Sequence, residues 1–161
     1  MRDLASYLTL KRLIGEATLT ASPAAVVIDR GNINNNLYEG IALGFYVGAG
    51  GIVFDAANYI GLKLEDCDDN ASWAAVTAAS SIVLGAGNPA GSNFAQVPDA
   101  NGFVRLINAA KAGADVDPFK VAYVGTKRYL KSTIVFGGAH GTGTLVGLVG
   151  ALGFPRLLPA A

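Results

Sequence analysis

The stretch that decides the fold runs from Tyr59 to Trp73 and reads YIGLKLEDCDDNASW. Its first half alternates between apolar and other residues, and the apolar positions are Ile60, Leu62 and Leu64. Alternation with a period of two and one apolar face predicts a half-buried β-strand. Residues 68–70 (Asp-Asp-Asn) tolerate left-handed backbone and bond their own main chain, so they predict a turn, and a second short strand ends at Val76. This unit of strand, acidic turn and strand favours an antiparallel sheet.

Most of the remaining chain also has the pattern of short strands. Apolar side chains alternate over residues 41–47, where the opposite face is nearly all small and leaves room for a close approach by another group. Residues 85–99 have the composition of a long loop, and residues 78–84 fit either a strand or a helical turn. Further strands are expected at residues 24–29, 103–107, 119–124, 128–136 and 145–152. The pattern predicts an all-β fold, namely an antiparallel β-sandwich of jelly-roll type.

The first 16 residues differ from the rest because they hold five of the charged side chains among scattered apolar ones. We expect an N-terminal arm over residues 1–16, either extended or a short helix, and a single β-sandwich domain over residues 17–161. A terminal segment of this kind orders poorly unless it docks on something. It is therefore expected either to fray against its own domain or to reach a neighbouring molecule.

The composition indicates a surface that is largely covered. Of the 161 residues, 52% are hydrophobic and only 15% are charged, and twelve basic residues balance twelve acidic ones. A neutral monomer with so little polar surface would be poorly soluble, so we expect partners or further copies of the chain to cover it. Neutrality argues against nucleic-acid binding. The most apolar run, residues 144–154, is too short for a membrane helix, and the start of the chain lacks a signal peptide, so we expect synthesis in the cytoplasm and no membrane association.

Few residues could carry catalysis or hold a metal. The single cysteine, Cys67, and the single histidine, His140, are too few for a structural zinc site, and no Gly-x-Ser-x-Gly motif supports a catalytic triad. The acidic cluster from Glu65 to Asp69 raises calcium binding as a hypothesis, but it lacks the EF-hand spacing, and a solvated turn is the simpler interpretation. We expect no cofactor, no bound metal and no enzyme activity. A basic cluster is expected to face solvent or to pair with the acidic turn, and it consists of Lys127, Arg128 and Lys131.

Four stretches carry a resemblance to a known family, and they are residues 1–6 (MRDLAS), 65–76 (EDCDDNASWAAV), 123–130 (YVGTKRYL) and 152–156 (LGFPR). They resemble a family of small structural proteins encoded in the head-gene clusters of tailed bacteriophages and prophages. The chain departs from the family pattern at three turn or surface positions. It has Asn70 where the family has Gly, Thr126 for a second Gly, and Phe154 for His.

The resemblance implies a virion structural protein, and most directly a capsid decoration (cement) protein that binds the outside of the major capsid shell and stabilises the mature head. Its partners would be the major capsid protein and copies of itself, with a trimer as the expected oligomer, and its location would be the capsid surface after synthesis in the bacterial host. We expect the contacts in the arm and in the long loop, at Leu4, Tyr7, Leu8, Leu13, Asn88 and Phe94. Deleting residues 1–14 would then abolish capsid binding without unfolding the domain.

Two other functions remain open at this point. The hairpin and the Arg-Tyr pattern are also similar to galactose-binding jelly rolls, which implies a carbohydrate- or receptor-binding module on the virion surface or tail. Its candidate sugar-stacking residues are Tyr46, Tyr59 and Trp73. A component of the head–tail connector is the other alternative.

Overall fold

The computed structural model describes residues 8–31, 38–50, 52–77, 81–85, 99–109 and 117–155, and all of its regular structure there is β-strand. One sheet, here called sheet A, consists of β1 (Leu8–Leu19), β3 (Tyr38–Gly50), β6 (Ser81–Gly85), β8 (Asp117–Tyr123) and β10 (Thr144–Pro155). The other, sheet B, consists of β2 (Val26–Asp29), β4 (Tyr59–Cys67), β5 (Ala74–Ala75), β7 (Phe103–Ile107) and β9 (Tyr129–Gly137).

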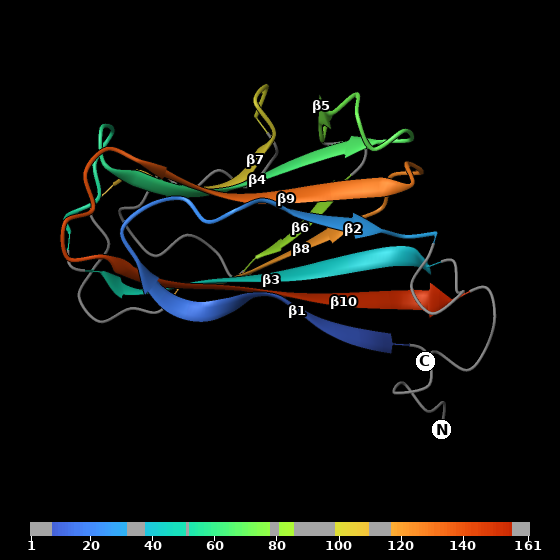
Figure 1. The fold of residues 1–161 in the computed structure, drawn as a ribbon, viewed down its shortest axis with the longest axis horizontal. Helices are drawn as coiled ribbons and strands as arrows, with labels where there is room; N and C mark the ends of the chain where they lie inside the picture. The colour runs from blue at the N-terminus through green and yellow to red at the C-terminus, as the bar shows by residue number, and fades with distance from the viewer. Residues whose placement is uncertain are drawn as a thin grey trace.

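The two sheets form the two layers of an antiparallel β-sandwich (Figure 1). The strand order in sheet A is β1-β10-β3-β8-β6. In sheet B it is β2-β9-β4-β5, with β7 also paired to β4. Every pairing is antiparallel. The predicted all-β fold and β-sandwich are confirmed.

The strand pairs are nested along the chain. The first long strand, β1, pairs with the last, β10, and β2 pairs with β9. Inside these, β3 pairs with β8, and β4 pairs with β7. The short strand β5 and the edge strand β6 are additions to this pattern. The first half of the chain thus folds back on the second half. Strands β1 to β4 alternate between the two sheets, and so do strands β7 to β10.

The core fills the space between the sheets because each sheet turns one apolar face inward. On β4 the alternating residues Ile60, Leu62 and Leu64 are fully buried. On β3 the alternating residues 41–47 are equally buried, and they meet partners from β8 and β10 such as Val121 and Leu148. The alternation in the sequence therefore identified the inward face of both strands.

The N-terminal region differs from the expected arm. Residues 8–16, expected to lie outside the domain, belong to β1 and pair with β10, with two register shifts along the way. The strand stays in place because Leu13, Ile14 and Leu19 pack against the core. The expected boundary at residue 16 falls inside this strand, whereas residues 1–7 lie outside the described part of the chain.

Candidate functional site

The acidic turn after β4 is built by its own side chains. The carboxylate of Asp69 accepts hydrogen bonds from the backbone N–H of Ala71 (2.9 Å) and Ser72 (2.7 Å) and from the Ser72 hydroxyl (2.6 Å). Between them Asn70 adopts a left-handed backbone with φ of 58°. The Ser72 hydroxyl first, and then the two N–H groups, hold the pKa of Asp69 below its ordinary value. The predicted hairpin is confirmed, since β5 pairs with the end of β4.

The neighbouring carboxylate of Asp68 connects the turn to the start of β9. It accepts hydrogen bonds from the Lys127 ammonium and from the backbone N–H of Arg128. The bond to Lys127 is the main cause that lowers the pKa of Asp68, and the same bond raises the pKa of Lys127. The Arg128 guanidinium in turn makes two 2.9 Å hydrogen bonds to Asp29 at the end of β2 and lowers the pKa of Asp29.

A buried hydrogen bond joins the two sheets beneath this turn. The hydroxyl of Tyr123 on β8 in sheet A donates to Asp66 Oδ2 on β4 in sheet B at 2.7 Å. Burial is the main cause that raises the pKa of Tyr123, and the bond to Asp66 raises it further because the carboxylate disfavours a second negative charge.

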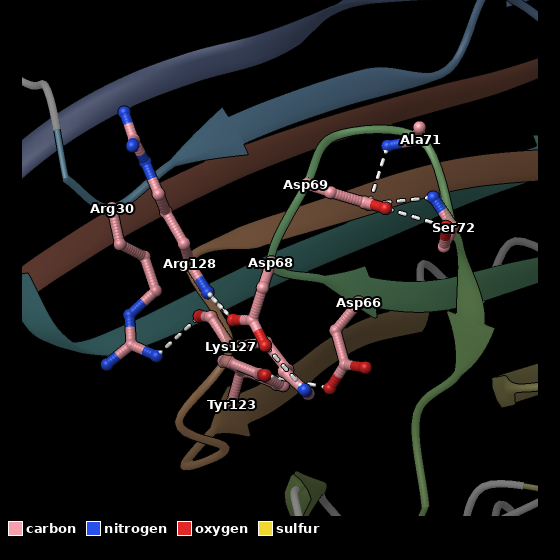
Figure 2. A network of polar contacts seen from close by, with 9 residues as sticks. All are labelled: Arg30, Asp66, Asp68, Asp69, Ala71, Ser72, Tyr123, Lys127 and Arg128. Atoms are coloured by element: carbon pink, nitrogen blue, oxygen red, sulfur yellow. Dashed lines mark hydrogen bonds and ion pairs between the residues drawn. The ribbon is translucent and has the colours of Figure 1, made fainter.

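Arg30 holds the same end of the sandwich together through backbone carbonyls. Its Nε and Nη2 donate to the carbonyls of Tyr38 (3.0 Å) and Glu39 (2.7 Å) at the start of β3. Its Nη1 donates to those of Gly125 (2.6 Å) and Lys127 (2.9 Å) in the connection from β8 to β9. Figure 2 shows the cluster, here called the latch, which consists of Arg30, Asp66, Asp68, Tyr123, Lys127 and Arg128.

The third basic residue of the predicted cluster lies on the outer face of sheet B. Lys131 makes a 2.7 Å ion pair with Glu65, and its ammonium lies 4.6 Å from the centre of the Trp73 ring. Glu65 also pairs with Lys63 at 3.2 Å. Burial raises the pKa of Glu65, but the bonds and charges of the two lysines outweigh it and leave that pKa below its ordinary value. All three basic residues thus have acidic partners, two of them within the predicted acidic cluster.

The latch has the chemistry of a structural connection. Each carboxylate of the acidic turn already bonds to a different protein group. Within the described ranges, no group of three or more His, Cys, Asp or Glu side chains is arranged to hold a metal ion.

His140 is buried, with its Nε2 2.8 Å from the carbonyl of Gly137 and its ring against Phe136. Over the described residues, no helix has the length and apolar character needed to cross a membrane.

The expected contact residues are only partly described. Leu8 begins β1 opposite Gly153 and is half-buried, and Leu13 is half-buried against the core. The other four lie outside the described residues, and they are Leu4, Tyr7, Asn88 and Phe94.

The three aromatic residues considered for sugar stacking do not form one platform. Tyr46 lines a hollow on sheet A. Tyr59 lies at the start of β4 in sheet B, edge-on to Phe103. Trp73 precedes β5, which pairs with the opposite end of β4.

Sequence reasoning missed Arg30. The residue follows a short strand in the sequence, and nothing nearby indicates its role. Its partners are backbone carbonyls up to 97 residues away, so no side-chain pattern could have identified them.

Comparisons with known proteins identify no relatives in sequence. No family model matches the chain, and no curated protein matches it. Among solved structures, the chain aligns with infectious bursal disease virus of the Gt strain at 14% identity and a TM-score of 0.28, covering 92% of this chain and 42% of that one. For the Gx strain the identity is 13% and the TM-score is 0.24, and the alignment covers 95% of this chain and 41% of that one. The chain spans less than half the length of these chains. Structural similarity at TM-scores this low supports no conclusion about function.

Proposed function

We propose that this chain is a virion structural protein, and specifically a capsid decoration (cement) protein that binds the outside of the major capsid shell and stabilises the mature head. The observation that carries the proposal is the latch (Figure 2). The two longest stretches of the family resemblance, residues 65–76 and 123–130, lie far apart in sequence and meet there through Tyr123 with Asp66 and Lys127 with Asp68. The polar residues of both motifs hold the protein together.

A mechanical role agrees with this use of polar residues. A protein that reinforces a shell needs two sheets that stay together, and the latch adds charged hydrogen bonds to the apolar core at one end of the sandwich. Of these bonds, the buried one between Tyr123 and Asp66 is of the kind that contributes about 1.5–3 kcal/mol. The Lys127–Asp68 pair is exposed to solvent and adds little. We therefore assign the charged and hydrogen-bonding residues of the latch to stiffening the protein. Its apolar surface would bind the capsid.

The energy of such binding comes from buried area and from repetition. An interface of about 1,600 Å² is the standard size for a specific complex, and apolar area contributes about 25 cal/mol per Å² before the costs of association. Copies that contact several capsid subunits gain further affinity through effective concentration. If the site exists only on the expanded shell, binding shifts the capsid population toward that mature state.

The copy number in purified particles tests the proposal. Quantitative mass spectrometry, normalised to the major capsid protein, should give a ratio near unity or a simple fraction of it. A few copies per particle would contradict decoration of the shell and would favour a connector or a receptor-binding module. Absence from particles would overturn the virion role itself.

A further inference from the structure

The outer face of sheet A is unusually smooth and apolar. Because cross-strand partners point to the same side, the register places seven small residues side by side on this face, and they are Gly40, Ala42, Gly44, Ala122, Gly147, Ala151 and Gly153. Leu10 and Val149 stand out from it with 81% and 54% of their surface exposed. The outer face of sheet B differs, because it carries the ion pairs of Lys63, Glu65 and Lys131.

Two hollows lie along this smooth face. One has a volume of about 690 Å³ and lies over Gly44 and Gly147, with Arg12, Glu16 and Lys120 among its lining residues. The other, of about 190 Å³, is lined almost entirely by apolar atoms around Ala42, Ala122 and Ala151. The glycine floor keeps the first hollow open: a Cβ atom at Gly44 would lie only 2.9 Å from Val149 Cγ2.

We propose that the occupant of this face is a second copy of the same chain, related by a two-fold axis. A two-fold contact needs a patch that complements itself. This face carries both a projection, at Val149, and a hollow over Gly44 and Gly147 that this side chain can enter in the other copy. It also carries both signs of charge, and Arg12 and Glu16 have no ion-pair partner among the residues that the structure describes.

The register defines how the charges meet. Arg12 lies opposite Val149, and Glu16 lies beside Gly147, so the two charges lie about one row apart along the same edge. A two-fold axis that crosses the strands between these rows brings Arg12 of each copy against Glu16 of the other. The ion pair then forms twice, and the apolar residues between the two edges are buried against each other.

The area of the face is sufficient for a stable dimer. Sheet A has five strands. With strands about 4.8 Å apart and about seven residues rising ~3.3 Å each, the face covers roughly 550 Å² per copy. The total of roughly 1,100 Å² exceeds the ~1,000 Å² expected of a biological contact. The contact gives a dimer in place of the trimer expected from the sequence, and it does not depend on the proposed function.

Light scattering after size exclusion tests the contact directly. The wild-type chain should elute as a dimer at micromolar concentration. Val149→Glu should be a monomer, because a dimer would bury two new carboxylates, one from each copy. The matched control is Val27→Glu, an exposed valine on sheet B (40% exposed), which should remain a dimer. Circular dichroism checks that both variants are folded.

A charge exchange tests the two-fold geometry. Arg12→Glu should weaken dimerisation at least about tenfold, because it sets two pairs of like charges against each other. Arg12→Glu combined with Glu16→Arg should restore it. A wild-type chain that stays monomeric, or equal effects of Val149→Glu and Val27→Glu, would overturn the proposal. A monomer that loses particle binding with Val149→Glu would assign the face to a capsid partner, which also overturns it.

Discussion

At the scale of single residues, Tyr123 has the clearest effect on stability. Its hydroxyl makes the buried hydrogen bond to Asp66 that joins the two sheets. Tyr123→Phe keeps the ring and leaves the buried carboxylate without this donor, so the free energy of unfolding should fall by about 1–3 kcal/mol. Urea unfolding followed by Trp73 fluorescence measures the loss. Tyr59→Phe, on a half-buried ring outside the latch, is the control and should change stability by less than about 0.5 kcal/mol.

The carboxylates of the latch region predict a loss of stability in acid. The pKa values of Asp29, Glu65, Asp68 and Asp69 are all lowered in the folded protein. A lowered pKa contributes stability above the ordinary value of roughly 4, and that contribution disappears as the pH falls through the folded value. The free energy of unfolding should therefore decrease steadily below about pH 4. Urea unfolding from pH 6 to 2 tests this, and a flat profile, or an unchanged slope in Asp29→Asn, would contradict it.

The raised pKa of Tyr123 predicts a loss of stability at high pH. A folded pKa above the ordinary value near 10 contributes stability at lower pH, and this contribution is lost as the pH rises toward the folded value. Wild-type stability should therefore fall above about pH 10, and Tyr123→Phe should fall less steeply. Equal slopes for the two proteins would show that Tyr123 does not titrate in this way.

At the scale of elements, the turn before β7 requires glycine. Gly102 has φ of +84°, and a Cβ there would lie 2.5 Å from the carbonyl oxygen of Leu64. That carbonyl belongs to β4, the strand with which β7 pairs. Gly102→Ala should destabilise the protein by about 1–3 kcal/mol through strain and displacement of β7. Gly141→Ala is the matched control, because no atom lies within 4 Å of its Cβ position, and thermal unfolding of the two variants should separate them clearly.

Because β1 begins at Leu8, a deletion that tests the arm should end at residue 7. Removing residues 1–14 would delete half of β1, including Leu13 and Ile14 on the core, and should lower the melting temperature markedly. Removing residues 1–7 leaves β1 whole, so it should preserve the melting temperature and, on the proposed function, abolish particle binding. Full particle occupancy by the shorter chain would remove the arm from the binding site.

At the scale of the whole molecule, the nested pairing predicts slow folding. The outermost pair joins Leu8 to Gly153, and β2 joins β9 across some hundred residues. Closing such large loops costs entropy before the contacts form, so refolding should take milliseconds to seconds or longer. Stopped-flow refolding followed by Trp73 fluorescence measures the rate. Complete refolding in microseconds would contradict the nested topology.

The nested pairs also bear on the jelly-roll prediction. We propose that they form a jelly roll, since its eight strands pair first with last and inward in turn, and β5 and β6 would be additions. Alternation in the sequence located the strands well, at 41–47 and 59–65 above all, because period two is a local property of strands. It could not state which strands are neighbours, because pairing depends on residues far away in the chain.

By itself the sequence determined the class of fold, the inward faces of β3 and β4, and the acidic turn, since each depends on neighbouring residues and their backbone preferences. The tertiary structure alone decided the remaining features. It placed residues 8–16 in a sheet instead of an arm, because the edge of β10 and the apolar core were available to them. It joined two distant motifs through Tyr123 and Lys127, and it collected small residues from three strands into one smooth face. These features arise from strand pairing, which brings distant residues together.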